Sequence, residues 1–339
     1  MKKVILLSLL PFTAMAAPSL KGFEKTYQDW DLICDNTGTC NMAGYPEYYS
    51  EHPVSILFTR SAGEKAPVTA QLALLREDVG NKTAEIILNG QSLGTIQNFS
   101  EEGNAKLSEK QTTELLTALK GNASIEVIFG EFKEKVSDKG AAAAMLKMDE
   151  FQQRLNTPSA LIRQGQEKHA VLAPQAAPKI EAVSVNNHKT IELKRGEKQF
   201  NHVLALLRKA YDGCVDEDLE SQDITLYPLT QNKVLAEALC ASGAYQSTNY
   251  YAVLDDKLSK VEQVLADQYN GVGGDRKQGY AFVRGAYKGR GAGDCWSIQD
   301  AVWNGKIFIL TSEWTTGSCK RFPDGAWQLP TFVSDIIVK

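Results

Sequence analysis

Residues 30–40 read WDLICDNTGTC, an apolar run and a turn-like segment bounded by two cysteines. The apolar run is typical of a β-strand. The five residues between Cys34 and Cys40 are mostly of the small polar and glycine types that form turns. A hairpin at this point would place the two sulfur atoms side by side. We therefore predict a disulfide between Cys34 and Cys40.

The other four cysteines also form neighbouring pairs along the chain, Cys214 with Cys240 and Cys295 with Cys319. An even number of cysteines in an exported protein favours a disulfide framework, and this layout favours three short-range bonds. Each bond is expected to contribute roughly 2–4 kcal/mol to stability. The sequence has no CxxC pair and no histidine at ligand spacing from a cysteine. We therefore expect no metal site, no cofactor and no thiol–disulfide oxidoreductase activity.

The first residues have the features of a signal peptide. Two lysines precede the apolar run Val4–Ala14, which is too short to cross a bilayer, and Ala14-Met15-Ala16 has the small-x-small pattern of a cleavage site. We predict that residues 1–16 are removed by cleavage after Ala16 and that the mature chain is periplasmic or secreted. An uncleaved anchor is the alternative. No later stretch is long and apolar enough for a transmembrane helix, so no stable membrane anchor is expected.

The composition is that of a globular protein. The chain has 339 residues, of which 43% are apolar and 23% charged, with a net charge of -4. These values exclude a collagenous, disordered or multi-pass membrane chain. The mild acidity gives no reason to expect nucleic-acid binding, which usually needs a strongly basic face.

The order of the patterns indicates an α+β, β-rich protein with two disulfide-stapled domains. Residues 17–165 are predicted to form an N-terminal β-sandwich-like domain with two helices. Residues 166–189 contain two prolines, several alanines and no aromatic residue, which is typical of a linker. Residues 190–339 are predicted to form a C-terminal domain of mixed antiparallel strands and short helices. The alternative is a single large domain in which the linker is an ordered surface loop.

Several local elements are specific enough to be tested. Ser108 and Gln111 have the spacing of a capping box, which starts a helix that Gly121 ends. A second helix is expected at Ala141–Leu155, and an amphipathic helix before Cys214. Asn304-Gly305 predicts a hairpin with a two-residue type I′ turn. The expected strands are Trp30–Cys34, Val54–Thr59, Val68–Leu74, Glu85–Leu88, Ile125–Phe129, Tyr250–Leu254, Lys260–Leu265 and Tyr280–Val283.

A glycine-rich basic segment is the first candidate binding site. No acidic residue lies between Asp275 and Asp294, and residues 288–294 read KGRGAGD. Backbone amides in such a loop can turn toward an anion, and an arginine can supply a planar fork for a carboxylate or phosphate. The alternative is a tight β connection whose glycines serve backbone geometry alone. The candidate anion- or partner-binding residues are Arg284, Lys288, Arg290 and Asp294.

A second candidate is the aromatic segment around Tyr45, Tyr48 and Tyr49, with His52 beside it. Clustered tyrosines are typical of surfaces that contact a partner. The alternative is packing against the sheet. The acidic run Asp216–Glu220 lacks the glycine and the terminal glutamate of a calcium loop, so we expect a solvated charged loop there.

Catalytic motifs are mostly absent from the sequence. It has no nucleophile elbow, no HExxH, no phosphate-binding GxxxxGK[ST] and no GxGxxG. A hydrolase could still use two converging carboxylates, as glycosidases do. The candidates are Asp275, Asp294 and Glu313, together with Arg290.

The residues around the cysteines resemble a known pattern. It consists of Trp30, Cys34-Asp35-Asn36, Cys40, Gly44-Tyr45, Leu239-Cys240, Gly243-Ala244-Tyr245, Lys288-Gly289-Arg290-Gly291, Gly293-Asp294-Cys295, Cys319 and Trp327-Gln328-Leu329-Pro330. On these residues the chain resembles an uncharacterised exported six-cysteine bacterial family, domain of unknown function 1176. The resemblance covers nearly the whole mature chain. It implies the architecture and the compartment, and no activity.

The N-terminal part is similar to a second family, the secreted invasion-associated locus B family. The shared features are Trp30 before Cys34, the Leu115–Leu119 helix that leads to a strand, and the helix at Gly140–Ala144. This similarity implies a β-sandwich and a role in the envelope or in host contact.

We therefore expect an exported periplasmic protein that is a non-enzymatic binding or structural module of the cell envelope. Its partner would be an envelope or host protein, or a small anionic ligand. The alternative is a periplasmic hydrolase acting on envelope material. A small-ligand carrier is a third possibility and would need an apolar cavity in one of the sheets.

Overall fold

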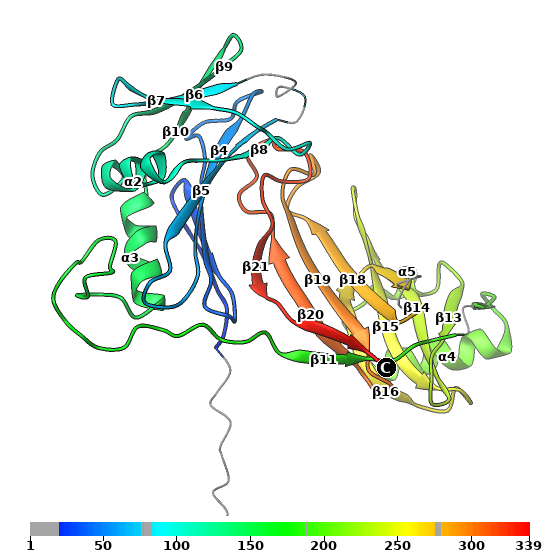
Figure 1. The fold of residues 1–339 in the computed structure, drawn as a ribbon. Helices are drawn as coiled ribbons and strands as arrows, with labels where there is room; N and C mark the ends of the chain where they lie inside the picture. The colour runs from blue at the N-terminus through cyan, green and yellow to red at the C-terminus, as the bar shows by residue number, and fades with distance from the viewer. Residues whose placement is uncertain (1–19, 76, 78–82, 187–188, 275–278) are drawn as a thin grey trace, which may run out of the picture.

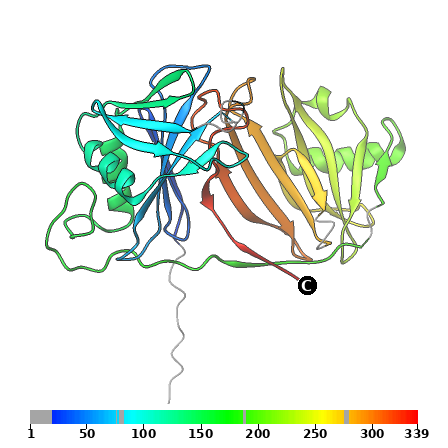
Figure 2. The same ribbon diagram turned by 45° about the horizontal axis from the view of Figure 1, so that its top comes forward.

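The computed structural model describes residues 20–75, 77, 83–186, 189–274 and 279–339 (Figures 1 and 2). These residues form five β-sheets and four α-helices, so the predicted β-rich class is confirmed. In this part of the chain, no helix is both long enough and apolar enough to span a bilayer. The predicted signal peptide, residues 1–16, lies outside the described residues.

The first half of the chain forms two antiparallel sheets and two helices. The elements are β1 (Phe23–Tyr27), β2 (Trp30–Cys34), β3 (Cys40–Gly44), β4 (Val54–Arg60), β5 (Val68–Leu74), β6 (Ala84–Leu88), β7 (Gln91–Ile96), β8 (Asn104–Lys106), α2 (Glu109–Ala118), β9 (Ile125–Phe129), β10 (Phe132–Val136) and α3 (Ala141–Phe151). One sheet has the order β1-β2-β3-β4-β5-β8 and the other β10-β9-β6-β7. The six-stranded sheet, the small sheet and both helices share one apolar core.

The six-stranded sheet is buried on both faces at its centre. Every residue of β2 and β3 is buried. Trp30 and Leu32 belong to the core under α3, whereas Ile33, between Leu32 and Cys34, belongs to a second cluster on the opposite face. A strand covered on both sides needs a continuous apolar run rather than an alternating one. This is why residues 30–34 contain so few polar side chains.

The second half of the chain forms two stacked five-stranded sheets. The elements are β12 (Ile191–Leu193), α4 (Lys198–Ala210), α5 (Asp216–Leu219), β13 (Ile224–Pro228), β14 (Lys233–Ser242), β15 (Ser247–Asp255), β16 (Val261–Tyr269), β17 (Gly271–Gly274), β18 (Ala281–Lys288), β19 (Trp296–Trp303), β20 (Phe308–Thr315) and β21 (Leu329–Phe332). Strands β12–β16 form one sheet and β17–β21 the other, each in sequence order. Helix α4 covers one face of the first sheet, and the second sheet packs on its other face.

The segment predicted as a linker runs below both halves of the molecule (Figure 2). It is fixed to the first half where the Leu172 carbonyl accepts the Gly63 N–H at 2.9 Å and where the Gln175 N–H donates to the Thr37 carbonyl at 3.0 Å. Further on, β11 (Lys179–Ala182) pairs in parallel with β22 (Asp335–Val338) near the end of the chain. Hydrogen bonds therefore hold the described part of this segment to both halves.

Most of the local predictions are confirmed. Ser108 and Gln111 form the capping box, and α2 ends at Ala118, shortly before Gly121. Helix α3 ends at Phe151 rather than at Leu155. The chain turns there because Arg154, which is fully buried, donates hydrogen bonds to Gln152 Oε1 at 3.0 Å and to carbonyls of the loop that follows β4.

Two local predictions are wrong in detail. The hairpin at Asn304 forms, but four residues connect Trp303 to Phe308, and among them Gly305 alone has a positive φ. A type I′ turn needs two such residues. Instead, Asn304 Oδ1 accepts the N–H groups of Lys306 at 2.9 Å and Ile307 at 2.8 Å, which closes a wider turn. The acidic run that starts at Asp216 is the one-turn helix α5 rather than a loop.

The three predicted disulfides are present, and the described residues include no free cysteine. Cys34 and Cys40 lie directly opposite each other in the β2–β3 register, as the hairpin requires. Three disulfides are consistent with folding outside the reducing cytoplasm.

Candidate functional site

The two halves of the chain meet along a seam between the six-stranded sheet and the loop that joins β20 to β21. Phe322, Trp327 and Leu329 from that loop and the start of β21 pack on the outer face of the sheet. The indole N–H of Trp327 donates to Ser55 Oγ at 2.7 Å, and both groups are buried. Because an unpaired polar group would be costly there, this hydrogen bond fixes the position of the loop.

Polar contacts hold the same loop to β2 and its neighbours. The Ser318 N–H donates to Asp31 Oδ2 at 2.6 Å, and its hydroxyl donates to Asp31 Oδ1 at 3.0 Å. The Lys320 ammonium donates to the Pro46 carbonyl at 2.6 Å and lies 3.3 Å from Asp29. The seam is therefore a bonded contact between segments nearly 300 residues apart in the sequence.

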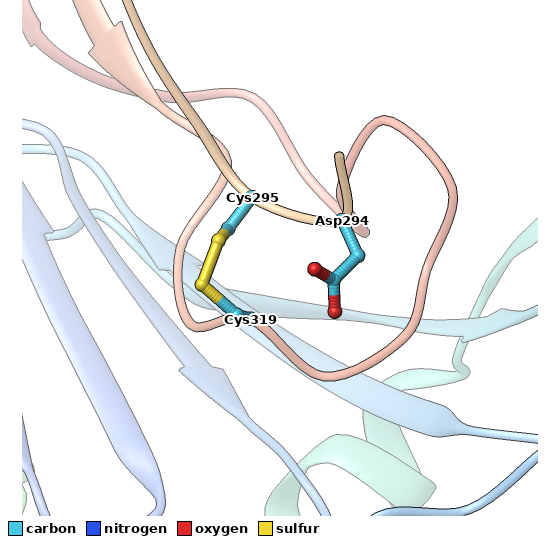
Figure 3. Close-up of side chains that lie close together, drawn as sticks. All are labelled: Asp294, Cys295 and Cys319. Carbon is cyan, nitrogen blue, oxygen red and sulfur yellow. A yellow bond between two sulfur atoms is a disulfide. The ribbon is translucent and has the colours of Figure 1, made fainter. Parts of the chain in front are cut away.

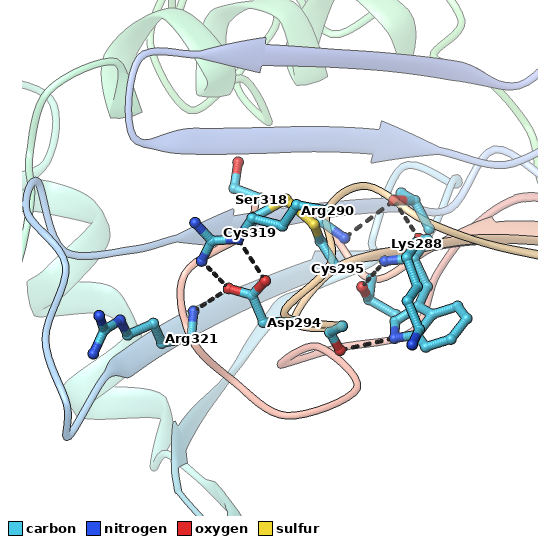
Figure 4. Close-up of a disulfide and its surroundings, with 12 residues drawn as sticks. Lys288, Arg290, Asp294, Cys295, Ser318, Cys319 and Arg321 are labelled. Carbon is cyan, nitrogen blue, oxygen red and sulfur yellow. Dashed lines mark hydrogen bonds and ion pairs between the residues drawn. A yellow bond between two sulfur atoms is a disulfide. The ribbon is translucent and has the colours of Figure 1, made fainter. Parts of the chain in front are cut away.

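The glycine-rich segment 288–294 lies against this loop because of the disulfide Cys295–Cys319 (Figure 4). Gly289 packs directly on the sulfur atoms. A Cβ at this position would lie 2.7 Å from Cys295 Sγ, closer than real Cβ atoms approach other heavy atoms. Gly293 has a φ of 70°, which a residue with a side chain rarely adopts. Gly289 therefore allows the segment to lie close to the disulfide, and Gly293 allows the turn.

Within this segment, the guanidinium of Arg290 is already paired with a carboxylate. Arg290 Nε donates to Asp294 Oδ1 at 2.7 Å, and Arg290 Nη2 donates to Asp294 Oδ2. The backbone N–H of Arg321 donates to the same carboxylate at 2.6 Å (Figure 4). The hydrogen bonds from Arg290 lower the pKa of Asp294 below its usual value. Burial acts in the opposite direction, and the Arg321 N–H lowers the pKa further. The carboxylate in turn raises the pKa of Arg290.

Arg290 also joins the two surfaces that the sequence predicted separately. Its Nη1 donates to the Tyr49 hydroxyl at 3.1 Å, and its guanidinium lies 4.9 Å from the centre of the Tyr49 ring. Tyr48 and Tyr49 are 76% and 63% exposed. Tyr245, also exposed, lies beside Gly291, the next residue along the chain. We name this set the Tyr–Arg surface; it consists of Tyr48, Tyr49, Tyr245 and Arg290.

The other predicted site residues lie elsewhere. Tyr45 is fully buried in the seam with Phe322 and Trp327, so its placement on an exposed contact surface was wrong. Among the described residues, no hydrogen-bond partner of standard geometry is found for its buried hydroxyl, and burial raises its pKa well above the usual value, against the opposing effect of the Ser318 backbone. Arg284 lies four residues before Lys288 on β18, about 13 Å along the strand, and makes its own fork with Asp300 at 2.7 and 2.9 Å.

Lys288 lies next to the Tyr–Arg surface but does not point into it. Its ammonium lies 5.2 Å from the centre of the Trp296 ring, and its backbone N–H donates to Gln246 Oε1 at 2.9 Å. Of the four candidate anion-binding residues, the structure therefore brings Arg290 and Asp294 into direct contact, with Lys288 nearby.

Two adjoining hollows open along the seam, and they share Leu75, Glu77 and Pro323. The smaller, of about 600 Å³, is lined by residues that include Arg290, Asp294 and Arg321. The larger, of about 840 Å³, is lined by the end of β5, by Asn104 and by residues 322–328. Residues 322–328 are not among the site residues predicted from the sequence. Trp327, an aromatic residue in a glycine- and proline-containing loop, was the signal for it.

One group among the described residues has the spacing of metal ligands: Asp294, Cys295 and Cys319, whose ligand atoms lie within 4.8 Å of one another (Figure 3). A thiolate is the form of cysteine that binds a metal. Here the two sulfur atoms are joined to each other, and the carboxylate already accepts hydrogen bonds from Arg290 and Arg321. With the two cysteines oxidised to a disulfide, this set of donor atoms does not suit a metal ion.

Of the three candidate catalytic carboxylates, the structure describes Asp294 and Glu313, and these two do not line the same hollow. Glu313 is not among the residues that line the hollow with Asp294; it accepts a hydrogen bond from the Thr331 hydroxyl at 3.1 Å. Asp275 lies outside the described residues. His52 lines the smaller hollow, but its ring stacks on Phe132 with 3.7 Å between centres. Of the two described candidates, Asp294 and Glu313, only Asp294 lines this hollow.

Comparison with known proteins identifies a family. The model of a family described as "Protein of unknown function (DUF1176)" matches residues 24–334. No curated protein and no solved structure matches the chain. The similarity of the N-terminal part to the invasion-associated locus B family is not shown by these comparisons and stays a prediction.

Proposed function

Because the chain belongs to the DUF1176 family, whose members are described only as proteins of unknown function, we propose its function from its geometry. We propose that it is an exported, non-enzymatic protein of the cell envelope that binds a partner protein through the Tyr–Arg surface. The predicted cleavage after Ala16 and the three disulfides support export. We also propose two domains, residues 17–165 and 190–339, joined by 166–189.

The observation that carries the proposal is the contact between Tyr49 and Arg290. It places an exposed tyrosine of a distant segment on one arginine, and Tyr and Arg are enriched among the residues that dominate binding energy. A tyrosine offers a large contact area with few rotatable bonds. Most exposed large apolar side chains on a protein surface are scattered singly. Here Tyr49 contacts the guanidinium itself, Tyr245 lies beside the next residue, Gly291, and Tyr48 precedes Tyr49 in the chain, which gives a surface suited to a partner protein.

The surface is held in place before a partner arrives. Asp294 orients Arg290, and the disulfide Cys295–Cys319 fixes the chain next to Asp294. Arg290 in turn contacts the ring of Tyr49. Rigid groups lose less conformational freedom on binding, so more of the contact energy contributes to affinity. Because Arg290 lowers the pKa of Asp294, the carboxylate stays ionised at neutral pH and keeps its hydrogen bonds to Arg290.

Chemical cross-linking to a fresh envelope extract tests this proposal. The variant Tyr49→Ala/Tyr245→Ala removes two rings of the surface. The control Ile307→Ala removes another exposed apolar side chain, 40% exposed, in the turn that follows β19, about 25 Å along the strand from Trp296. We expect a partner that the wild type and the control capture equally and that the double variant does not. Equal capture by all three proteins would contradict the proposal, as would no capture by the wild type.

A further inference from the structure

Strand β10 is an end strand of its sheet, and its outer edge carries unpaired backbone groups. In the order β10-β9-β6-β7, it pairs with β9 on one side. The backbone groups of successive residues in a strand point to alternate sides. Ser137, the residue after β10, donates its N–H to the Tyr45 carbonyl at 3.0 Å, and its carbonyl accepts the Trp30 indole N–H at 2.8 Å. Its groups therefore point away from β9, and so do those of Lys135 and Lys133, two and four residues earlier.

The backbone groups of these two lysines are available to another chain. Across the described residues, no hydrogen bond outside the β9 pairing involves the backbone N–H or carbonyl of Lys133 or Lys135. Unpaired groups along a strand edge are a template for a further strand. The two residues together offer two donors and two acceptors, about 7 Å apart along the strand.

A hollow of about 560 Å³ lies beside this edge, and its volume is within the usual range for ligand sites. It is lined by residues 133–138, by residues 123–125 and by residues 46–50, which belong to the loop between β3 and β4. That loop is attached to β10 at two points, the Tyr45–Ser137 hydrogen bond and a hydrogen bond from the Ser50 hydroxyl to Glu134 Oε1 at 2.6 Å. Between these points the described loop makes no backbone hydrogen bond to β10, so the edge opens into the hollow.

The hollow is continuous with the Tyr–Arg surface. Tyr48 and Tyr49, which are largely exposed, line it together with the edge of β10. A chain paired with β10 would therefore pass beside the tyrosines to which the proposed function assigns partner contact.

Charge in the hollow is already balanced by neighbouring groups. The ammonium groups of Lys133 and Lys135 lie 2.8 and 3.7 Å from the Glu126 carboxylate. The carboxylates that line the hollow also have partners: Glu47 pairs with Lys139, Glu134 with the Ser50 hydroxyl, and Asp138 with the Ala123 N–H at 2.8 Å. The backbone edge, rather than a charged side chain, is therefore the feature that a ligand can recognise.

A second copy of this chain does not suit the edge. In any antiparallel register that uses the free groups of both copies, a lysine of one β10 lies opposite a lysine of the other. Like charges directly opposite each other destabilise a strand pair. The occupant is therefore a different chain.

We propose that an extended segment of a partner protein binds to β10 as an additional strand, through the backbone N–H and carbonyl groups of Lys133 and Lys135. The main-chain hydrogen bonds supply affinity, and Tyr48 and Tyr49 contact the side chains of the added segment. This inference rests on the proposed function, because it describes how the partner of the Tyr–Arg surface is held.

The variant Lys135→Pro tests the backbone pairing. A proline removes the outward N–H of residue 135 and leaves the pairing with β9, whose hydrogen bonds come from Glu134 and Val136. The control Lys135→Ala removes the same side chain and charge and keeps the N–H. Urea midpoints show whether both variants fold.

The probes are random ten-residue peptides displayed on phage and selected on the wild-type mature chain. We expect enriched peptides that bind Lys135→Ala within twofold of the wild type and bind Lys135→Pro at least tenfold more weakly. Enriched peptides that all bind the three proteins equally would overturn the proposal, as would a selection that yields no peptide.

Amide hydrogen exchange of the wild type gives a second measurement that needs no variant. The N–H groups of Lys133 and Lys135 should exchange rapidly in the free protein and at least tenfold more slowly with an enriched peptide bound. Unchanged exchange at both residues would overturn the proposal even if Lys135→Pro does not fold.

The cross-linking assay separates this inference from the proposed function. Full capture of the partner by Lys135→Pro, with no capture by Tyr49→Ala/Tyr245→Ala, would overturn the strand pairing and leave the Tyr–Arg surface standing. Absence of a captured partner, with peptides that behave as expected, would contradict the Tyr–Arg surface and support the strand pairing.

Discussion

Replacing Asp294 with asparagine keeps the shape of the side chain and removes its charge. The wild-type carboxylate accepts two hydrogen bonds from Arg290 and one from the Arg321 N–H. An asparagine keeps a single acceptor oxygen and turns its NH2 group toward a donor. Arg290 would then lose one of its two hydrogen bonds to residue 294. Its guanidinium would be held less firmly in its contact with Tyr49.

The cost can be worked out from the exposure of the two partners. Hydrogen bonds to a charged group contribute about 1.5–3 kcal/mol when they are buried. The Asp294 side chain is 4% exposed, but that of Arg290 is 34% exposed, so water replaces part of what the guanidinium loses. We therefore expect Asp294→Asn to lower the free energy of unfolding by about 2 kcal/mol.

Asp300→Asn is the matched control, because Asp300 forms the same kind of fork with Arg284. The side chains of this pair are 17% and 50% exposed, so the pair is nearer to a surface salt bridge. We expect a loss of about 0.5–1 kcal/mol for this variant. Urea unfolding followed by tryptophan fluorescence gives both values at pH 7.

The pH dependence separates a charge effect from a packing effect. Because the pKa of Asp294 is lowered in the folded protein, its stabilising contribution is present above about pH 3.8, the ordinary value for the unfolded chain. It is lost as the pH falls through the lowered pKa. The difference between wild type and Asp294→Asn should therefore shrink as the pH falls below 3.8. A difference smaller than that of Asp300→Asn, or one that does not shrink in acid, would refute the reasoning.

Other substitutions test the rest of the architecture by urea midpoint. Replacing both cysteines of Cys214–Cys240 with alanine should cost about 3.5 kcal/mol, against about 2 kcal/mol for Cys34–Cys40, because the closed loops span 26 and 6 residues. Equal losses would contradict this loop-length argument. Tyr45→Phe removes a buried hydroxyl that has no partner of standard geometry among the described residues and should stabilise the protein by about 1 kcal/mol; a loss of stability would reveal a hidden bond. Gly289→Ala should cost about 1–3 kcal/mol through its clash with Cys295 Sγ, and an unchanged midpoint would show that the segment can shift.

The two candidate surfaces show where sequence reasoning reached its limit. The tyrosines and the basic glycine-rich segment could be identified as candidates from their composition alone. Their meeting could not be predicted, because the hydrogen bond between Arg290 and Tyr49 joins residues 241 apart. The pairing of Arg290 with Asp294, only four residues away, was within reach of the sequence. The burial of Tyr45 was not, because the residues that cover it, Phe322 and Trp327, come from the far end of the chain.

The amino-acid sequence alone was sufficient for the features that act over short distances. The hairpin disulfide Cys34–Cys40 and the capping box at Ser108 depend on groups within six residues of one another, so local geometry specifies them. The two hollows on the seam and the Tyr–Arg surface exist only in the folded chain. They form where a loop before β21 is pressed against the outer face of the six-stranded sheet. That contact depends on packing between segments nearly 300 residues apart, and no local pattern carries that information.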